Sequence, residues 1–182
     1  MTHFPVPVRS PQNRLKWALA AAAVAGVALG VTIVAMNADA IGRAAGRSGG
    51  LHAPDLALLF AEKPIVVAHV LVALAALVLG PVMLLSRKGA AFHRAAGWTW
   101  VALMGATAAS TFLIVGADGR YSFIHVQSVV TLVLLPIAVH AARTHAVRRH
   151  RALMLWLYWL MLVGAALFTL VPGRLIWLLF FG

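Results

Sequence analysis

Five long apolar stretches alternate with short polar segments along this chain, at residues 17–36, 64–85, 95–115, 121–142 and 152–171. Each is about 20 residues long, which at about 1.5 Å per residue is enough to cross the ~30 Å hydrocarbon layer of a bilayer. The pattern predicts an all-α, polytopic transmembrane helical bundle of about five spans. A four-helix core at 64–182 would follow one N-terminal transmembrane helix at 17–36.

The polar segments before the core divide into a tail and a loop. Residues 1–16 are expected to form a cytoplasmic tail, and residues 37–63 an outer loop. Within that loop, residues 54–60 are expected to form a short interfacial helix. Asp55 lies in its first turn, where a negative charge suits the positive end of the helix dipole, and its Leu and Phe side chains can lie on the lipid headgroups.

Proline marks the expected limits of the core. Pro64 is expected to begin the second span, because proline is tolerated in the first turn of a helix. Pro172 and Gly173 are expected to end the fifth span, which leaves a C-terminal segment too short to cross. The residues Ala38-Asp39-Ala40 resemble a signal-peptide cleavage site, but the apolar run before them is longer than a usual signal core, which favours an uncleaved first span.

The charged residues are distributed unequally between the two sides of the predicted membrane. Ten of the 15 Lys and Arg residues fall in the tail and in the second and fourth loops: Arg9, Arg14, Lys16, Arg87, Lys88, Arg94, Arg143, Arg148, Arg149 and Arg151. The opposite side has the other five together with all four acids: Arg43, Arg47, Lys63, Arg120, Arg174, Asp39, Asp55, Glu62 and Asp118. The positive-inside rule then predicts a cytoplasmic N-terminus and a C-terminus on the opposite side of the membrane.

The composition agrees with a lipid environment. Hydrophobic residues make up 63% of the chain and charged residues 10%. The net charge of +11 lies in loops and at helix ends and forms no basic helix face, so we expect the bilayer as partner and no nucleic acid. Four tryptophans near the predicted cytoplasmic boundary are expected to form an aromatic belt: Trp98, Trp100, Trp156 and Trp159.

Two absences in the sequence exclude several kinds of chemistry. The chain has no cysteine, which excludes a disulfide, a thiolate nucleophile and a thiolate metal site. No Asp or Glu falls within a predicted span, which excludes a carboxylate proton relay at mid-membrane. These observations do not indicate whether the protein is an enzyme.

Two histidines lie at matching depths in the predicted spans. His69 is five residues past Pro64, and His125 is five residues past Arg120 on a span that runs in the same direction. Neutral imidazoles from neighbouring helices can ligate a metal or hold a haem between them. The sequence predicts His69 and His125 as a cofactor or metal pair; the alternative is that both form hydrogen bonds between helices.

A second group of histidines lies toward the cytoplasmic side. We expect His93, with His140 or His150, to form an inner cofactor site. Arg94 and Arg151 directly follow two of these histidines, and their charges would suit the propionates of a haem. The alternative is that these side chains are solvated among the loop arginines.

Three motifs give the region from His69 to Arg151 a family resemblance. They are Leu79-Gly80-Pro81-Val82 after His69, Phe92-His93-Arg94-Ala95-Ala96-Gly97, and His150-Arg151 with Met154 close behind. The region resembles the bacterial membrane proteins grouped as domain of unknown function 2306. The resemblance implies a polytopic protein with four or more helices, and no assigned reaction. It also implies the bacterial inner membrane, in which the predicted orientation would make the C-terminus periplasmic. The family pattern has Trp before that Met and Arg after it, where this chain has Leu153 and Leu155.

Two functions from different classes follow. The layout of histidines is similar to that of transmembrane b-type cytochromes, which predicts a haem-b protein that transfers electrons across the membrane. The alternative is a non-catalytic membrane protein, an assembly partner or a small-molecule permease, whose histidines are structural. A metal-dependent membrane hydroxylase is less favoured, because such sites have closely spaced histidine clusters that this sequence lacks.

Overall fold

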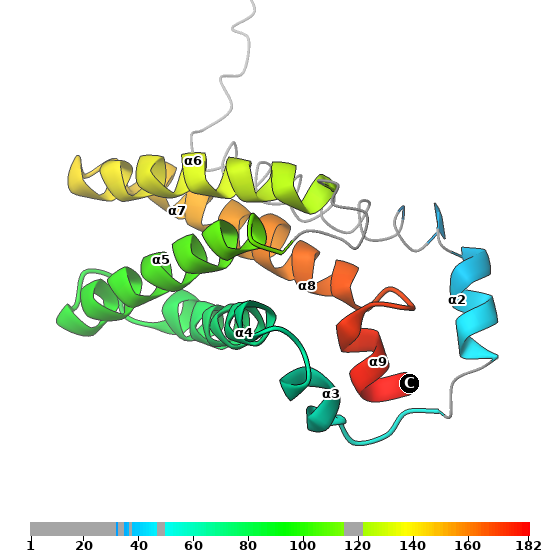
Figure 1. Ribbon diagram of the computed structural model, residues 1–182. Coiled ribbons are helices and arrows are strands. Elements are labelled where there is room, and N and C mark those ends of the chain that lie inside the picture. The colour runs from blue at the N-terminus through cyan, green and yellow to red at the C-terminus, as the bar shows by residue number, and fades with distance from the viewer. Residues whose placement is uncertain (1–31, 33–34, 37, 47–49, 115–121) are drawn as a thin grey trace, which may run out of the picture.

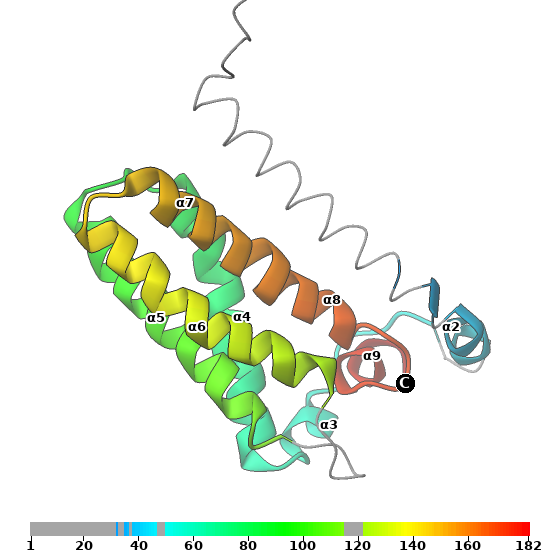
Figure 2. The same ribbon diagram turned by 90° about the horizontal axis from the view of Figure 1, so that it is seen from above.

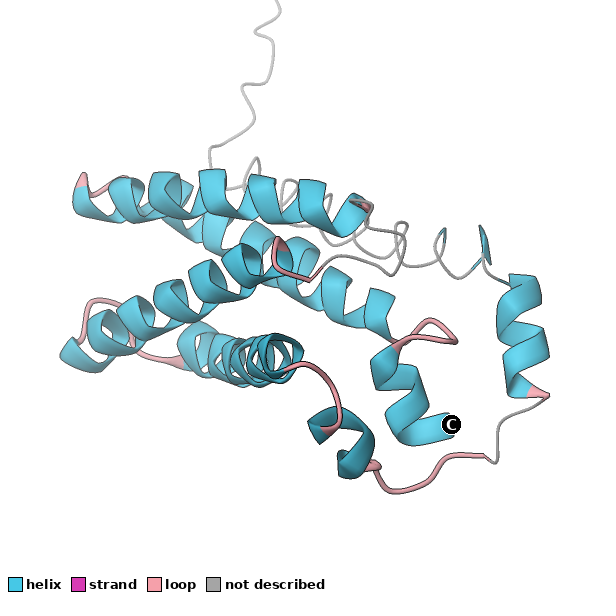
Figure 3. Cartoon of the chain, viewed as in Figure 1, coloured by secondary structure: helices cyan, strands magenta, loops and turns pink. Residues whose placement is uncertain are grey.

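The structure is a computed structural model that describes residues 32, 35–36, 38–46, 50–114 and 122–182 (Figure 1). Within these residues every regular element is a helix, which confirms the predicted all-α class (Figure 3). The predicted tail at 1–16 and nearly all of the predicted span at 17–36 lie outside the described residues.

Four rods form the bundle that the sequence predicts for residues 64–182. They are α4 (Pro64–Leu85), α5 (Ala91–Thr111), α6 (Phe123–Arg143) and a continuous last rod made of α7 (Val147–Trp156), the π-helix η1 (Leu157–Val163) and α8 (Gly164–Thr169). Helix α5 packs on α4 and α6, α6 packs on α7, and η1 packs back on α4, which closes the ring (Figures 1 and 2).

Short helices lie at one end of the bundle. Helix α3 (Leu56–Phe60) begins after Asp55, whose carboxylate accepts from the backbone N–H of Ala57 at 3.0 Å, which confirms the short helix predicted there. Helix α9 (Leu175–Phe181) packs on α3, and α2 (Ala38–Ala45) precedes both in the chain. We call this end of the bundle the α3 end. We call the other end, with the connections 86–90 and 144–146, the basic end (Figure 2).

The hairpin of α4 and α5 follows from its turn residues. Pro64 occupies the first turn of α4, as predicted, and Ser86 caps its C-terminus in an extended conformation. Gly89 has a φ of 80°, which only glycine adopts without strain, and its carbonyl accepts from the Arg94 guanidinium at 2.6 Å. Three side-chain hydrogen bonds then join the two helices, at both ends and in the middle: His69–Ser110, His93–Ser86 and Trp100–Ala76.

The core lies in the middle of the bundle, where small residues allow close packing. Tyr158 packs directly against Gly80, and its hydroxyl donates to the carbonyl of Leu77 at 3.3 Å. Trp100 is only 4% exposed, and its indole N–H donates to the carbonyl of Ala76 at 3.0 Å. The buried cluster comprises Ala76, Trp100, Met104, Leu135, Ala138, Leu157, Tyr158 and Leu162.

The outer surface of the bundle is apolar. On α4, Val78 and Leu85 are 69% and 89% exposed, and on α6 Val126 and Val133 are similarly exposed. Surfaces of this kind suit lipid, and in water they would be a large apolar patch. Among the described residues three helices are long and apolar enough to cross a membrane: Pro64–Leu85, Phe123–Arg143 and Val147–Thr169.

Helix α5 differs from its predicted span. It has the length to cross, but it is not among the three helices that also meet the composition required, because it contains Arg94 and several hydroxyl side chains. It begins four residues before the predicted start of its span at 95. The last rod likewise begins at Val147 rather than 152. A helix continues as long as its backbone hydrogen bonds do, so it extends past the apolar boundary into polar residues.

Trp100 contradicts the predicted aromatic belt, as a comparison with Trp98 on the same helix shows. Trp98 is 54% exposed, and the Arg143 guanidinium lies 5.7 Å from the centre of its ring. Trp100, two residues further, faces the opposite way and is buried in the core. The prediction for Trp100 was wrong because residues two positions apart on a helix point in nearly opposite directions.

Candidate functional site

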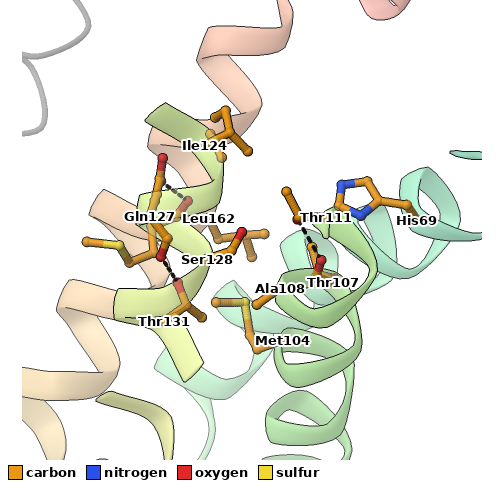
Figure 4. Close-up of a pocket in the computed structure, with 12 residues that line it drawn as sticks. His69, Met104, Thr107, Ala108, Thr111, Ile124, Gln127, Ser128, Thr131 and Leu162 are labelled. Atoms are coloured by element: carbon orange, nitrogen blue, oxygen red, sulfur yellow. Dashed lines mark hydrogen bonds between the residues drawn. The ribbon is translucent and has the colours of Figure 1, made fainter. Parts of the chain in front are cut away.

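A cavity of about 60 Å³ with both polar and apolar lining residues lies in the bundle, toward the α3 end. Figure 4 shows His69 on α4 at one side, Gln127, Ser128 and Thr131 on α6 at the other, and α5 between them. The lining comes from all four rods: His69, Met104, Thr107, Ala108, Thr111, Ile124, Gln127, Ser128, Thr131, Met161, Leu162 and Ala165.

The polar side chains face inward because of their helical spacing. On α6, Ser128 and Thr131 are three residues apart and both are buried, whereas Val126 and Val133 point outward. On α5, Thr107 and Thr111 are four residues apart on the same face. This half of the bundle therefore has polar groups among the apolar ones of its interior, while its outer surface is apolar.

The threonine hydroxyls donate their protons to their own helices. Thr107 donates to the carbonyl of Leu103 at 2.9 Å, Thr111 to that of Thr107 at 3.0 Å, and Thr131 to that of Gln127 at 2.9 Å. A hydroxyl has one proton and two lone pairs, so each threonine oxygen retains acceptor capacity. These three residues consequently contribute acceptors to the cavity.

The π-helix η1 supplies the wall opposite α5. Its wider turns leave backbone carbonyls for other donors, and the Gln127 side-chain amide donates to those of Met161 at 2.6 Å and Leu160 at 3.2 Å. Single π-helical turns are frequent at functional sites. Because the amide N–H groups of Gln127 donate to η1, its side-chain oxygen is the group that remains available to accept another hydrogen bond.

His69 is oriented by Ser110. Its Nδ1 lies 2.8 Å from the Ser110 hydroxyl, and that hydroxyl donates its only proton to the carbonyl of Thr107 at 3.0 Å. The hydrogen-bond network thus assigns the proton of the neutral ring to Nδ1, which donates to Ser110. The second ring nitrogen, Nε2, is then an acceptor.

His125 has a structural role. It is the third residue of α6, and its Nδ1 accepts from the backbone N–H of Ser122 at 3.0 Å, while the Ser122 side chain accepts from the backbone of His125. This is a capping box in which His replaces the usual Glu or Gln, and Ser122-x-x-His125 is its signature in the sequence. The neutral ring has its proton on Nε2, the opposite of His69, and it packs edge-on against Phe112 at 5.9 Å between ring centroids.

The predicted outer pair is therefore not joined at one site. His69 lines the cavity, whereas His125 is not part of the lining. The cavity is also far smaller than the ~300–1,000 Å³ of pockets for drug-sized ligands. A cofactor shared by these two rings stays a prediction.

At the basic end, the structure brings His93 close enough to His150 for their charges to interact. The Ser86 hydroxyl donates to the carbonyl of Met83 at 3.0 Å, so His93 Nδ1, 3.0 Å from the Ser86 oxygen, is the donor in that contact. His150 Nδ1 likewise donates to the carbonyl of Ala138 at 2.9 Å. Both rings therefore keep an Nε2 lone pair.

The other predicted residues of this inner site are less involved. His140 is exposed, and so is Arg151. The Arg94 guanidinium donates to the loop carbonyl of Gly89. Among the described residues, no group of three or more His, Asp or Glu side chains could hold a metal ion.

Sequence reasoning singled out the histidines and missed most of the cavity. Its threonines, serine and glutamine lie in stretches that look uniformly apolar in composition. The signal that would have found them is the spacing of Thr107 with Thr111, and of Ser128 with Thr131, at three or four residues within predicted spans.

The apolar outer surface, the three helices of membrane-spanning length and the buried polar groups define a polytopic helical membrane protein. A family model described as predicted membrane protein (DUF2306) matches residues 66–182, more than half of the chain. The chain belongs to this family, which confirms the resemblance drawn from its motifs. No curated protein and no solved structure matches the chain.

Proposed function

We propose that this membrane protein binds a small polar solute in the His69 cavity, as a small-molecule permease would. The observation that carries the proposal is the inward-facing set of polar side chains from three of the rods in a bundle with an apolar exterior. Polar residues within membrane helices that face the bundle interior are expensive and commonly mark substrate pathways. The alternative, in which the threonines and Gln127 serve only carbonyls of the protein itself, leaves the inward position of Ser128 without a reason.

The proposal includes an orientation. The basic end has Arg87 and Lys88 in the connection 86–90 and Arg148, Arg149 and Arg151 in the first turns of α7, and the positive-inside rule would place that end in the cytoplasm of a bacterial cell. Helix α5, packed along α4 and α6 over its length, would cross with them. The cavity then lies in the periplasmic half. A C-terminal alkaline phosphatase fusion should be active and a C-terminal green fluorescent fusion dark; the reverse pattern would exclude this orientation.

Because the natural chain has no cysteine, single cysteines can test whether the cavity contains water. We expect Ser128→Cys to react with methyl methanethiosulfonate, a small neutral reagent that requires the thiolate. Two controls should stay unmodified: Ala138→Cys, at a fully buried core position, and Val133→Cys, at a lipid-facing position of α6 that is 54% exposed. Mass spectrometry measures the modification. Protection of Ser128→Cys equal to that of Val133→Cys would exclude a solute site here.

A haem-b protein that transfers electrons is the second candidate function. The observation that favours it is that His93 and His150 both lie at the basic end, each with Nδ1 donating and Nε2 open. Histidines that ligate metals commonly have this arrangement. Bound haem would supply one-electron chemistry, and Arg151 is the exposed arginine that would pair with its propionates.

The visible spectrum of the purified protein tests this candidate. A bis-histidine haem would give a sharp α-band on reduction, and that band should disappear in His93→Ala and in His150→Ala. It should remain in His125→Ala, since His125 caps α6. Protein purified without iron or haem would exclude the candidate.

A further inference from the structure

The geometry points to a ligand class for the cavity: a small primary ammonium ion, such as ammonium or methylammonium. This inference rests on the proposed solute-binding function and deepens it. It follows from the donors and acceptors of the lining. Some of them already form hydrogen bonds within the protein, and the others remain available to a ligand.

The threonines leave only acceptors. The protons of Thr107, Thr111 and Thr131 are all donated to carbonyls of their own helices, as described above. A ligand that enters the cavity therefore meets three hydroxyl oxygens whose lone pairs are available and whose protons are not. A hydrogen-bond donor is favoured, and an anion or a carbonyl compound is disfavoured.

His69 adds a nitrogen acceptor, which favours an ammonium ion over a metal cation. With Nδ1 donating to Ser110, its Nε2 offers a lone pair to a ligand. Hard alkali and alkaline-earth cations prefer oxygen ligands. An N–H group can donate equally well to oxygen or to an imidazole nitrogen. The mixed set of oxygens and nitrogen therefore suits an ammonium ion better than Na⁺ or K⁺.

Ser128 gives an independent observation. Its side chain is only 6% exposed and lines the cavity. A hydroxyl in this position can form a hydrogen bond with a ligand in the cavity. Because a hydroxyl rotates freely, Ser128 can turn its lone pairs toward a donor, as the threonines do.

Size and charge narrow the ligand further. The cavity of about 60 Å³ has room for a few water-sized groups, since one water needs roughly 10–15 Å³ of cavity volume of this kind. Ammonium and methylammonium are of this size and donate hydrogen bonds, whereas a quaternary ammonium has no N–H group to donate. The described residues from Pro64 onward contain no Asp or Glu, so lone pairs and dipoles would hold the cation, as carbonyl dipoles do in ion-selectivity filters.

The test is thermal unfolding of the full-length protein in detergent, in chloride salts of equal ionic strength. Ammonium and methylammonium chloride should raise Tm above its value in sodium, potassium or tetramethylammonium chloride, on the order of 2–4 °C at a concentration well above Kd. Thr131→Val and Thr107→Val should lose most of this increment. Thr99→Val is the matched control and should retain the increment in Tm. Thr99 donates in the same way, to the carbonyl of Ala95 at 3.2 Å, but it lies on the exposed side of α5.

The outcomes separate the two proposals. Equal Tm values in ammonium and in sodium or potassium chloride, with Ser128→Cys still modified, would overturn the ligand class and leave a hydrated solute site. An ammonium effect that Thr131→Val, Thr107→Val and Thr99→Val all retain in full would place binding elsewhere and also overturn it. Protection of Ser128→Cys from the thiol reagent would overturn the solute site itself.

Discussion

The two ends of the α4–α5 hairpin contain the same bond in different surroundings. At the α3 end, His69 donates to Ser110, and at the basic end, His93 donates to Ser86. Each serine in turn donates to a backbone carbonyl three residues earlier. His69 lies in a membrane-spanning helix beside an acceptor-lined cavity, whereas His93 lies among the cations of the loops.

The comparison teaches that surroundings, more than the bond itself, assign a role to each histidine. Both bonds fix a tautomer and join two helices. At the α3 end the fixed tautomer would present a neutral acceptor to a solute in the cavity. At the basic end the same tautomer presents Nε2 near His150, where positive charge from Lys88 opposes a cation and favours a ligand with anionic groups.

A packed layer separates the two ends. Met104 belongs both to the buried core and to the cavity lining, so the core begins where the cavity ends. Trp100, Leu157 and Tyr158 continue this layer toward the basic end. The two histidine sites therefore act independently, and changes to the layer should affect stability most.

The largest expected effect is at Gly80. A Cβ there would overlap the ring of Tyr158, whereas a Cβ at Gly97 meets only the end of Met83 at 3.5 Å. We expect Gly80→Ala to destabilise by ~1–3 kcal/mol through overpacking. Gly97→Ala should be neutral or stabilising by up to ~1 kcal/mol, since alanine is the better helix former. Thermal unfolding in detergent measures both, and a rise in Tm for both variants would show that the layer is not tightly packed.

A smaller loss is expected at Trp100. Trp100→Phe removes the hydrogen bond to Ala76 and part of the ring, at a cost of about 1–2 kcal/mol. Trp98→Phe is the matched control on the same helix, because Trp98 is more than half exposed, and its Tm should change little. Equal losses for the two variants would contradict the separate roles of these tryptophans.

The sequence predicted the architecture better than the site. The bounds of α4 are those expected from Pro64 and the apolar run, because the proline and the start of the apolar run coincide there. The motifs around Gly80 and His93 also led to the correct family. Composition could not show where helices extend into polar loops, so α5 and the last rod began earlier than predicted.

The histidine pairing shows what spacing alone misses. Equal depth suggested His69 with His125, but depth does not define the direction of a ring. Ser122 turned His125 into a capping residue, and Ser110 turned His69 toward α5. The inner pair was predicted with two alternatives for the partner of His93. The course of α7 brings His150 within reach of the charge of His93, whereas His140 is exposed, and a cofactor shared with His93 stays a prediction.

The smallest expected effect tests the comparison most directly. Ser110→Ala and Ser86→Ala each remove one interhelical hydrogen bond of the same kind, and each should lower stability by only ~0.6 kcal/mol, the average for such bonds in membrane proteins. Their effects on ligand binding should differ. Without Ser110, His69 Nδ1 loses its acceptor and the ring is no longer held with Nε2 as the acceptor, so the ammonium-dependent rise in Tm should shrink. Ser86→Ala should retain the full rise, because His93 lies on the other side of the packed layer. If both variants lost the rise, the two ends would be coupled through the core, and if neither did, Ser110 would have no part in orienting His69.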